Sequence, residues 1–157
     1  MAGVCIGAMI ISQLNHRQPQ PEATMSASPS VLFVCLHGSA KSFIAARHFE
    51  RMAAARGLSM QARSAGLEPD PVVPPHVIAG LAADGIEVLS AILAEATAEL
   101  AEDVSRVVAF GCDVSAVGIE RDVIQWPDVP AVSDGYGPAR DAIVVRLHAL
   151  LNELAPT

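Results

Sequence analysis

The pattern of apolar and polar positions predicts an alternation of strands and helices. Residues 31–35 form an apolar run of strand-forming side chains, and an amphipathic helical pattern begins at Ser42 and ends before Gly57. A second strand-like run covers residues 60–65 and is closed by Gly66. The first third of the domain is therefore expected to read strand, tight loop, helix, strand.

The rest of the chain continues this alternation. Pro74 and Pro75 suit a helix start, an apolar stripe follows, and Gly85 suits the helix end. The further expected elements are a helix at 93–100, strands at 106–110 and 123–124, and a helix at 138–154, with residues 86–89 as an optional short strand outside the count of four. Continuous apolar runs are typical of strands buried on both faces of a parallel sheet. We predict a three-layer α/β sandwich with a four-stranded, mostly parallel sheet.

Composition narrows the class of protein. A length of 157 residues suits one domain with a substantial core, and a net charge of -7 argues against a nucleic-acid partner. No apolar run approaches the roughly 20 residues that cross a bilayer, so no membrane partner is expected. The three cysteines, Cys5, Cys35 and Cys112, lie far apart and do not suggest a disulfide framework. We expect a cytoplasmic protein.

The N-terminal stretch differs from the remainder. Residues 1–29 end in a Gln-, Pro- and Ser-rich segment without periodicity, which predicts a flexible extension ahead of a domain at residues 30–157. Met25 is an alternative start. A cleaved export signal is a further alternative, although no Lys or Arg precedes the apolar run at residues 4–11.

The loop between the first strand and the first helix carries candidate chemistry. Backbone N–H groups at a helix start attract an oxyanion, and the same field favours the thiolate form of Cys35. Lys41 adds a positive charge and is the only lysine beside nine arginines. A cysteine at the end of a buried strand can equally be a small packing residue.

The loop resembles the Cys-x5-Arg-Ser phosphate-binding loop of the low-molecular-weight protein tyrosine phosphatases and related arsenate reductases. It begins with Cys35, which is followed by five residues and then by Lys41 and Ser42. Later landmarks follow in the same order: Ser64-Ala65-Gly66, Pro74 to Gly85, Val107 to Phe110, and an acidic site near Trp126-Pro127-Asp128. The resemblance covers residues 31–154 and implies the phosphotyrosine phosphatase I-like fold. Lys41 departs from the family's arginine, which grips two phosphate oxygens at once.

The resemblance also implies roles. Cys35 would attack phosphorus and carry a thiophosphate, Ser42 would donate a hydrogen bond to its sulfur, and Lys41 would neutralise the bound oxyanion. Asp128 would act as the acid and then as the base, with Asp134 in reserve. Asp128 could instead simply form a turn beside proline. The expected phosphate-binding residues are Leu36, His37, Gly38, Ser39, Ala40 and Lys41. No cofactor and no metal are implied.

The predicted function is a cysteine-dependent phosphomonoester hydrolase, whose partner is a phosphorylated substrate or a small oxyanion. One alternative is arsenate reduction at the same cysteine, in which Cys112 would be a redox partner or an external thiol would act as reductant. Cys112 is otherwise a small buried residue. Another alternative is an oxyanion-binding module that lost turnover together with its arginine.

Overall fold

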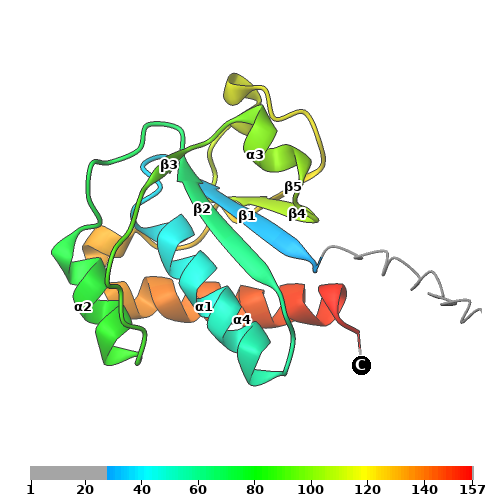
Figure 1. Ribbon diagram of the computed structural model, residues 1–157. Helices are drawn as coiled ribbons and strands as arrows, with labels where there is room; N and C mark the ends of the chain where they lie inside the picture. Colours follow the sequence, from blue (N-terminus) through cyan, green and yellow to red (C-terminus); the bar gives the residue numbers. More distant parts are fainter. Residues whose placement is uncertain (1–27, 157) are drawn as a thin grey trace, which may run out of the picture.

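The computed structural model describes residues 28–156. The expectations for residues 1–27, including the alternative start at Met25 and the export signal, lie outside the described residues. Figure 1 shows a single sheet with helices on both of its faces, which is the predicted three-layer α/β arrangement.

The sheet has five strands, all parallel, in the order β3-β2-β1-β4-β5. The strands are β1 (Ser30–Cys35), β2 (Gln61–Gly66), β3 (Ala94–Glu95), β4 (Arg106–Ala109) and β5 (Val123–Gln125). The prediction of four strands is corrected by β3. This strand is two residues long, pairs only with the end of β2, and is too short to leave a periodic pattern in the sequence.

β1 is the centre of the sheet. Its residues 31–34 are fully buried, and it pairs with β2 on one side and β4 on the other. Such a strand must be apolar on both faces, which explains the continuous run in the sequence. In the register, Cys35 lies opposite Gly66 and Val34 lies opposite Ala109. The carboxyl ends of three strands therefore meet at the edge that carries Cys35.

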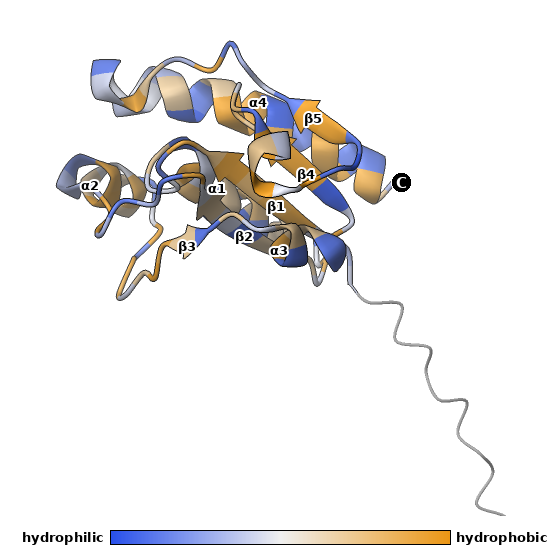
Figure 2. Ribbon diagram, turned by 90° about the horizontal axis from the view of Figure 1, so that it is seen from above, coloured by the Kyte–Doolittle hydropathy of each residue, from blue (hydrophilic) through white to orange (hydrophobic). Residues whose placement is uncertain are grey.

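The helices divide unequally between the faces. They are α1 (Lys41–Ala55), α2 (Pro75–Ala83), α3 (Ala98–Glu102) and α4 (Tyr136–Leu154), with short 3-10 turns η1 (Val114–Val117) and η2 (Val132–Asp134). α1, α2 and α4 share one core with Phe33 and Trp126. α3 and η1 cover the other face over Leu32 and Val34. Figure 2 shows the strongly hydrophobic β1 and β4 enclosed between these layers.

Two expected elements differ from the structure. Residues 86–89 form no strand, and of the helix expected at 93–100 only its end exists, as part of α3. The reason is tertiary pairing: Ala94 joins the edge of β2, and the Ala96 N–H donates to the Gly66 carbonyl at 2.8 Å. Thr97 then caps α3, because its hydroxyl accepts from the Leu100 N–H at 3.2 Å.

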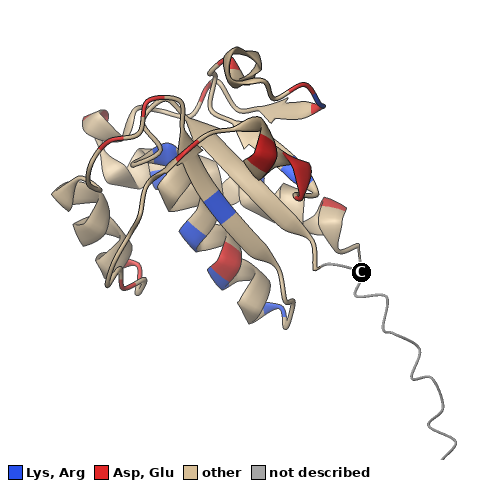
Figure 3. Ribbon diagram, turned by 45° about the horizontal axis from the view of Figure 1, so that its top comes forward, with Lys and Arg blue, Asp and Glu red and all other residues tan. Residues whose placement is uncertain are grey.

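Charge is unevenly placed on this frame. Figure 3 shows acidic segments on α3 and on the loop after β2, and basic segments on α1 and β2. None of the helices in residues 28–156 combines the length and apolar character needed to cross a membrane.

Candidate active site

The sulfur of Cys35 sits at the end of β1 with two polar neighbours. The side chain of Ser42 lies 3.0 Å from it through Oγ, and the Gly38 backbone N–H donates to it at 3.2 Å. Cys35 is 8% exposed and Ser42 is fully buried. Hydrogen bonds from a hydroxyl and an amide stabilise a thiolate, so this arrangement suits a nucleophilic sulfur.

The loop from β1 to α1 requires two glycines. Gly38 has a φ of +65°, the left-handed conformation that side chains rarely adopt. Gly66 passes so close beneath it that a Cβ on Gly66 would lie 2.6 Å from the backbone N of Gly38. The two backbones can touch only because neither residue has a side chain.

The segment after β2 braces this loop. The amides of Leu67 and Glu68 donate to the carbonyls of Cys35 and Leu36 at 3.2 and 2.8 Å. Further along, the Asp70 amide donates to the His37 carbonyl at 3.0 Å. These bonds continue the β1–β2 pairing into the loop and hold its shape.

A cavity of about 320 Å³ opens over Cys35. Its walls come from the loop, from the segment before and into α2, from Phe110 after β4, and from the residues around η2. The lining residues are Cys35, Leu36, His37, Ser39, Ala40, Lys41, Asp70, Pro74, His76, Phe110, Ala131, Val132 and Ser133. Figure 3 shows the acidic loop after β2 close to the basic start of α1 at this edge.

The start of α1 leaves backbone donors for a ligand. In the described part of the chain, no side chain caps this helix, whose N-cap is Ala40. The N–H groups of an uncapped first turn are unsatisfied and carry the positive end of the helix dipole. Lys41, the first residue of α1, lines the same cavity and carries a positive charge. The geometry suits a tetrahedral anion held against Cys35.

The structure therefore brings most of the predicted residues together. Cys35, Leu36, His37, Ser39, Ala40 and Lys41 line one cavity. Ser42 lies beneath the sulfur, and Gly38 contributes its N–H from the loop backbone.

Asp128 does not join them. It is not among the cavity-lining residues, its side chain is 73% exposed, and its carboxylate pairs with Arg146 Nη2 of α4 at 2.6 Å. The hydrogen bond from Arg146 lowers the pKa of Asp128, whereas a general acid at neutral pH needs a raised one. In this structure Asp128 thus lies outside the cavity, and its role as the acid stays a prediction. Asp134 is also exposed and lies outside the lining.

Cys112 packs on the opposite face of the sheet from Cys35, against the α3 side of the core. Its Sγ donates to the Val34 carbonyl at 3.6 Å, and burial raises the pKa of its thiol. The residue does not line the cavity over Cys35. Both interpretations of Cys112, as a packing residue and as a redox partner, stay predictions.

Sequence reasoning missed Asp70 and His76 as cavity residues. Asp70 accepts a hydrogen bond from the Ser39 hydroxyl at 2.5 Å, and its second oxygen lies 3.6 Å from His37 Nδ1. The sequence signal was weak, because a carboxylate among prolines usually indicates a turn. Only the fold brings residue 70 beside residue 39.

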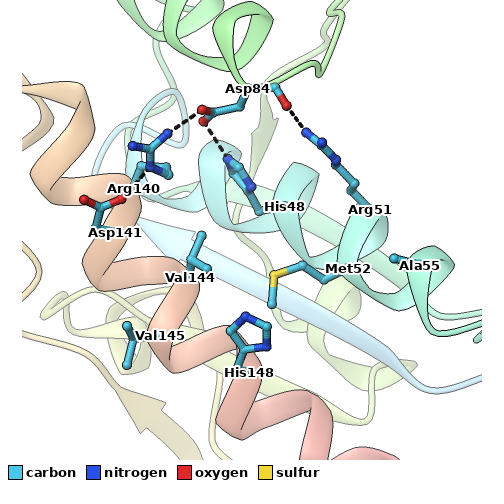
Figure 4. Close-up of a pocket in the computed structure, with 10 residues that line it drawn as sticks. All are labelled: His48, Arg51, Met52, Ala55, Asp84, Arg140, Asp141, Val144, Val145 and His148. Atoms are coloured by element: carbon cyan, nitrogen blue, oxygen red, sulfur yellow. Dashed lines mark hydrogen bonds and ion pairs between the residues drawn. The ribbon is translucent and has the colours of Figure 1, made fainter.

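A second hollow of about 580 Å³ lies between α1 and α4. Asp84, the residue after α2, lies at the polar end of this hollow, where its carboxylate accepts a hydrogen bond from Arg140 and lies 3.3 Å from His48 Nε2 (Figure 4). The Tyr136 hydroxyl also donates to this carboxylate, at 2.8 Å. Arg51 donates to the Asp84 carbonyl. His48 is buried here. This cluster joins three helices and lies apart from Cys35.

Comparison with known proteins agrees with this geometry. A family model described as low molecular weight phosphotyrosine protein phosphatase matches residues 30–116, more than half of the chain. The chain belongs to this family. A search of curated proteins found no match.

Solved structures of the family and its relatives share the fold. The YwlE arginine phosphatase, in a mutant with a phosphorylated active-site serine, is 25% identical, with a TM-score of 0.71 over 80% of this chain and 95% of that one. A Bacillus subtilis low molecular weight protein tyrosine phosphatase is 25% identical, with a TM-score of 0.67 over 80% and 96%. The Corynebacterium glutamicum thioredoxin-dependent arsenate reductase, at 23% identity and a TM-score of 0.68 over 82% and 63%, shares the fold alone.

Proposed function

We propose that this member of the family hydrolyses phosphomonoesters through Cys35. The observation that carries the proposal is the position of its sulfur: it accepts the Gly38 N–H at 3.2 Å, lies 3.0 Å from the Ser42 hydroxyl, and faces a cavity at the uncapped start of α1. The same sulfur thus has two hydrogen-bonding neighbours beside a set of donors that suits an oxyanion.

The chemistry has two displacement steps. The Cys35 thiolate attacks phosphorus, forming the S–P bond while the bond from phosphorus to the leaving oxygen breaks. Water then attacks the thiophosphate and releases orthophosphate and the thiolate. Loop amides and the Lys41 ammonium stabilise the charge on the equatorial oxygens, and Ser42 assists departure of the sulfur. No step draws on a metal or a cofactor.

The position of Asp128 shapes the expected substrate range. With this carboxylate paired to Arg146 outside the cavity, the leaving oxygen receives no proton from it. Aryl phosphates, whose leaving groups are stable anions, should react faster than alkyl phosphates, whose leaving alkoxides require protonation. Lys41 offers a point charge in place of a planar fork, so we expect slower turnover than an arginine would give.

The test is hydrolysis of 4-nitrophenyl phosphate by the wild type, Cys35→Ser, Cys112→Ser and Lys41→Arg. We expect turnover in the wild type, loss in Cys35→Ser, little change in Cys112→Ser, and a gain in Lys41→Arg. Equal turnover by the wild type and Cys35→Ser would refute the proposal. Tight phosphate binding without hydrolysis, with turnover appearing in Lys41→Arg, would instead identify an oxyanion-binding module.

Arsenate reduction at Cys35 is the second candidate, because arsenate has the same tetrahedral shape as phosphate and would fit the same donors. The position of Cys112 on the other face of the sheet favours the form of this chemistry that uses an external thiol. Arsenate-dependent oxidation of a supplied thiol is the measurement that separates it from hydrolysis. Both reactions need a reduced Cys35, which supports a reducing compartment such as the cytoplasm.

A further inference from the structure

The hollow between α1 and α4 is a cavity that the proposed hydrolysis does not use. Its volume of about 580 Å³ exceeds the volume of about 320 Å³ over Cys35 and lies within the range of small-molecule sites. Much of its wall is apolar, with Met52 and Ala55 from α1 and Val144 and Val145 from α4. Val145 is 69% exposed, so a ligand in the hollow covers apolar surface that folding leaves in water.

The polar end of this hollow is organised by contacts within the protein. His48 is 7% exposed, and its Nε2 lies 3.3 Å from the Asp84 carboxylate. Arg140 pairs with this carboxylate and also with the exposed carboxylate of Asp141. Figure 4 shows these charged groups gathered at one end, with the apolar walls beside them. Both carboxylates have a cationic partner, which weakens the attraction of this end for a cationic ligand.

Arg51 is the cation at this end that has no carboxylate partner among the described residues. Within the same residues its guanidinium makes one hydrogen bond, to the Asp84 carbonyl. Gly85 lies beside it, since a Cβ on Gly85 would be 3.5 Å from Arg51 Nη1. A guanidinium carries N–H donors on each of its nitrogens, so the carbonyl contact orients the group and leaves other donors free. A fixed positive charge therefore stands next to an apolar wall.

We propose that the hollow between α1 and α4 binds small amphipathic anions, in which an apolar chain or ring carries one carboxylate. The apolar part lies against Met52 and Val144, and the carboxylate accepts N–H groups of Arg51. Paired N–H···O bonds between a guanidinium and a carboxylate are among the stronger hydrogen bonds. The protein has a net charge of -7, so general attraction does not explain anion binding, and the local cation has to supply it. The inference does not depend on hydrolysis at Cys35.

The test is calorimetric titration of the full chain with decanoate, decylammonium and acetate. Decanoate presents an apolar chain and a carboxylate, decylammonium reverses the charge of the head group, and acetate removes the chain. We expect binding of decanoate, binding of decylammonium that is weaker by about tenfold or more, and no binding of acetate at the same concentrations. Equal affinities for decanoate and decylammonium would overturn the inference.

Arg51→Gln tests the anchoring cation, and Arg47→Gln is its matched control. Arg47 lies one turn earlier on α1, over the Phe43 ring, and does not line the hollow. Arg51→Gln should weaken decanoate binding by about fivefold or more, because charge-assisted hydrogen bonds are lost, and Arg51→Lys should retain more of the affinity. Arg47→Gln should change the affinity by less than about twofold, because solvent screens a charge outside the hollow. An unchanged affinity in Arg51→Gln would refute the proposed contact.

The place of binding is tested separately, because the cavity over Cys35 also combines apolar walls with a cation. Ala55 is exposed on α1, so Ala55→Phe narrows the hollow and should weaken decanoate binding. Decanoate should shift the amide NMR signals of residues that line the hollow more than those of residues 36–41. Cys35→Ser should bind decanoate with the affinity of the wild type. The largest shifts in residues 36–41, or displacement of decanoate by inorganic phosphate, would place the ligand over Cys35 and refute the inference.

Discussion

Replacing Asp84 by Asn should destabilise the protein by about 2–4 kcal/mol. The Asp84 side chain is 16% exposed, and its carboxylate accepts from Arg140 and Tyr136 and faces His48. Hydrogen bonds to a charged group contribute roughly 1.5–3 kcal/mol each, but their effects overlap within one network. Asn keeps one oxygen and turns an NH₂ toward groups that are themselves donors, so Arg140 loses a largely shielded counter-charge.

The chain provides a matched control in Asp141. The same Arg140 donates through Nε to Asp141 Oδ1 at 2.7 Å, but the Asp141 side chain is 72% exposed. An exposed ion pair is screened by water and contributes little, so Asp141→Asn should cost less than about 0.5 kcal/mol. Each of the two variants removes one carboxylate partner of Arg140, and the two partners differ in their exposure to solvent.

The assay is urea unfolding followed by fluorescence of Trp126, the only tryptophan, which is 8% exposed. The midpoint should fall in Asp84→Asn with an unchanged dependence on urea concentration, which indicates a change of stability rather than of the denatured state. In a double-mutant cycle, Asp84→Asn should cost less when Tyr136 is already Phe. A loss below about 1 kcal/mol, or no larger than that of Asp141→Asn, would refute the network as a source of stability.

Three further predictions concern the loop and the helix beside it. Gly66→Ala should lower the free energy of unfolding, measured by thermal unfolding, by about 1–3 kcal/mol and abolish most hydrolysis. The reason is that its Cβ would lie 2.6 Å from the backbone N of Gly38. Unchanged hydrolysis would contradict this close packing. Ser42→Ala should slow iodoacetamide alkylation of Cys35 at pH 7 by roughly threefold to tenfold, measured in Cys112→Ser; an unchanged rate would remove Ser42 from thiolate stabilisation. Burial lowers the pKa of His48 below 6.5, because its effect exceeds the opposite effect of the Asp84 carboxylate; the positive charges of Arg51 and Arg140 lower this pKa further. The folded state therefore binds fewer protons than the unfolded state. His48 thus contributes stability above pH 6.5 that is lost as the pH falls through its lowered folded pKa. In His48→Gln the urea unfolding midpoint should therefore decrease less between about pH 7 and 5 than in the wild type. The same decrease in both proteins would contradict this prediction.

Local patterns predicted the elements that local residues determine. The expected helix from Ser42 is α1 within one residue at each end, because its apolar spacing and Gly57 are both read from neighbouring positions. The central strand was equally visible, since burial on both faces demands a continuous apolar run. The landmarks around Cys35 identified the family for the same reason.

Other features depend on partners far along the chain. β3 exists because Gly66 offers a carbonyl to Ala96, thirty residues later, and nothing near Ala96 indicates this. Asp128 follows the expected sequence position but pairs with Arg146, whose place on α4 decides the direction of the carboxylate. Sequence can indicate which carboxylates exist, but only the fold decides which of them reach the cavity.

The hydroxyl of Ser39 shows how a local shortage of hydrogen bonds becomes a binding site. A serine beside the start of a helix commonly caps it, as Thr97 caps α3. Ser39 instead donates to Asp70, and α1 has no side-chain cap within the described residues. The first-turn N–H groups are therefore left without an internal acceptor at the point where Cys35 and Lys41 face the cavity. A bound oxyanion satisfies those donors, so affinity for the ligand arises from bonds that folding leaves unmade.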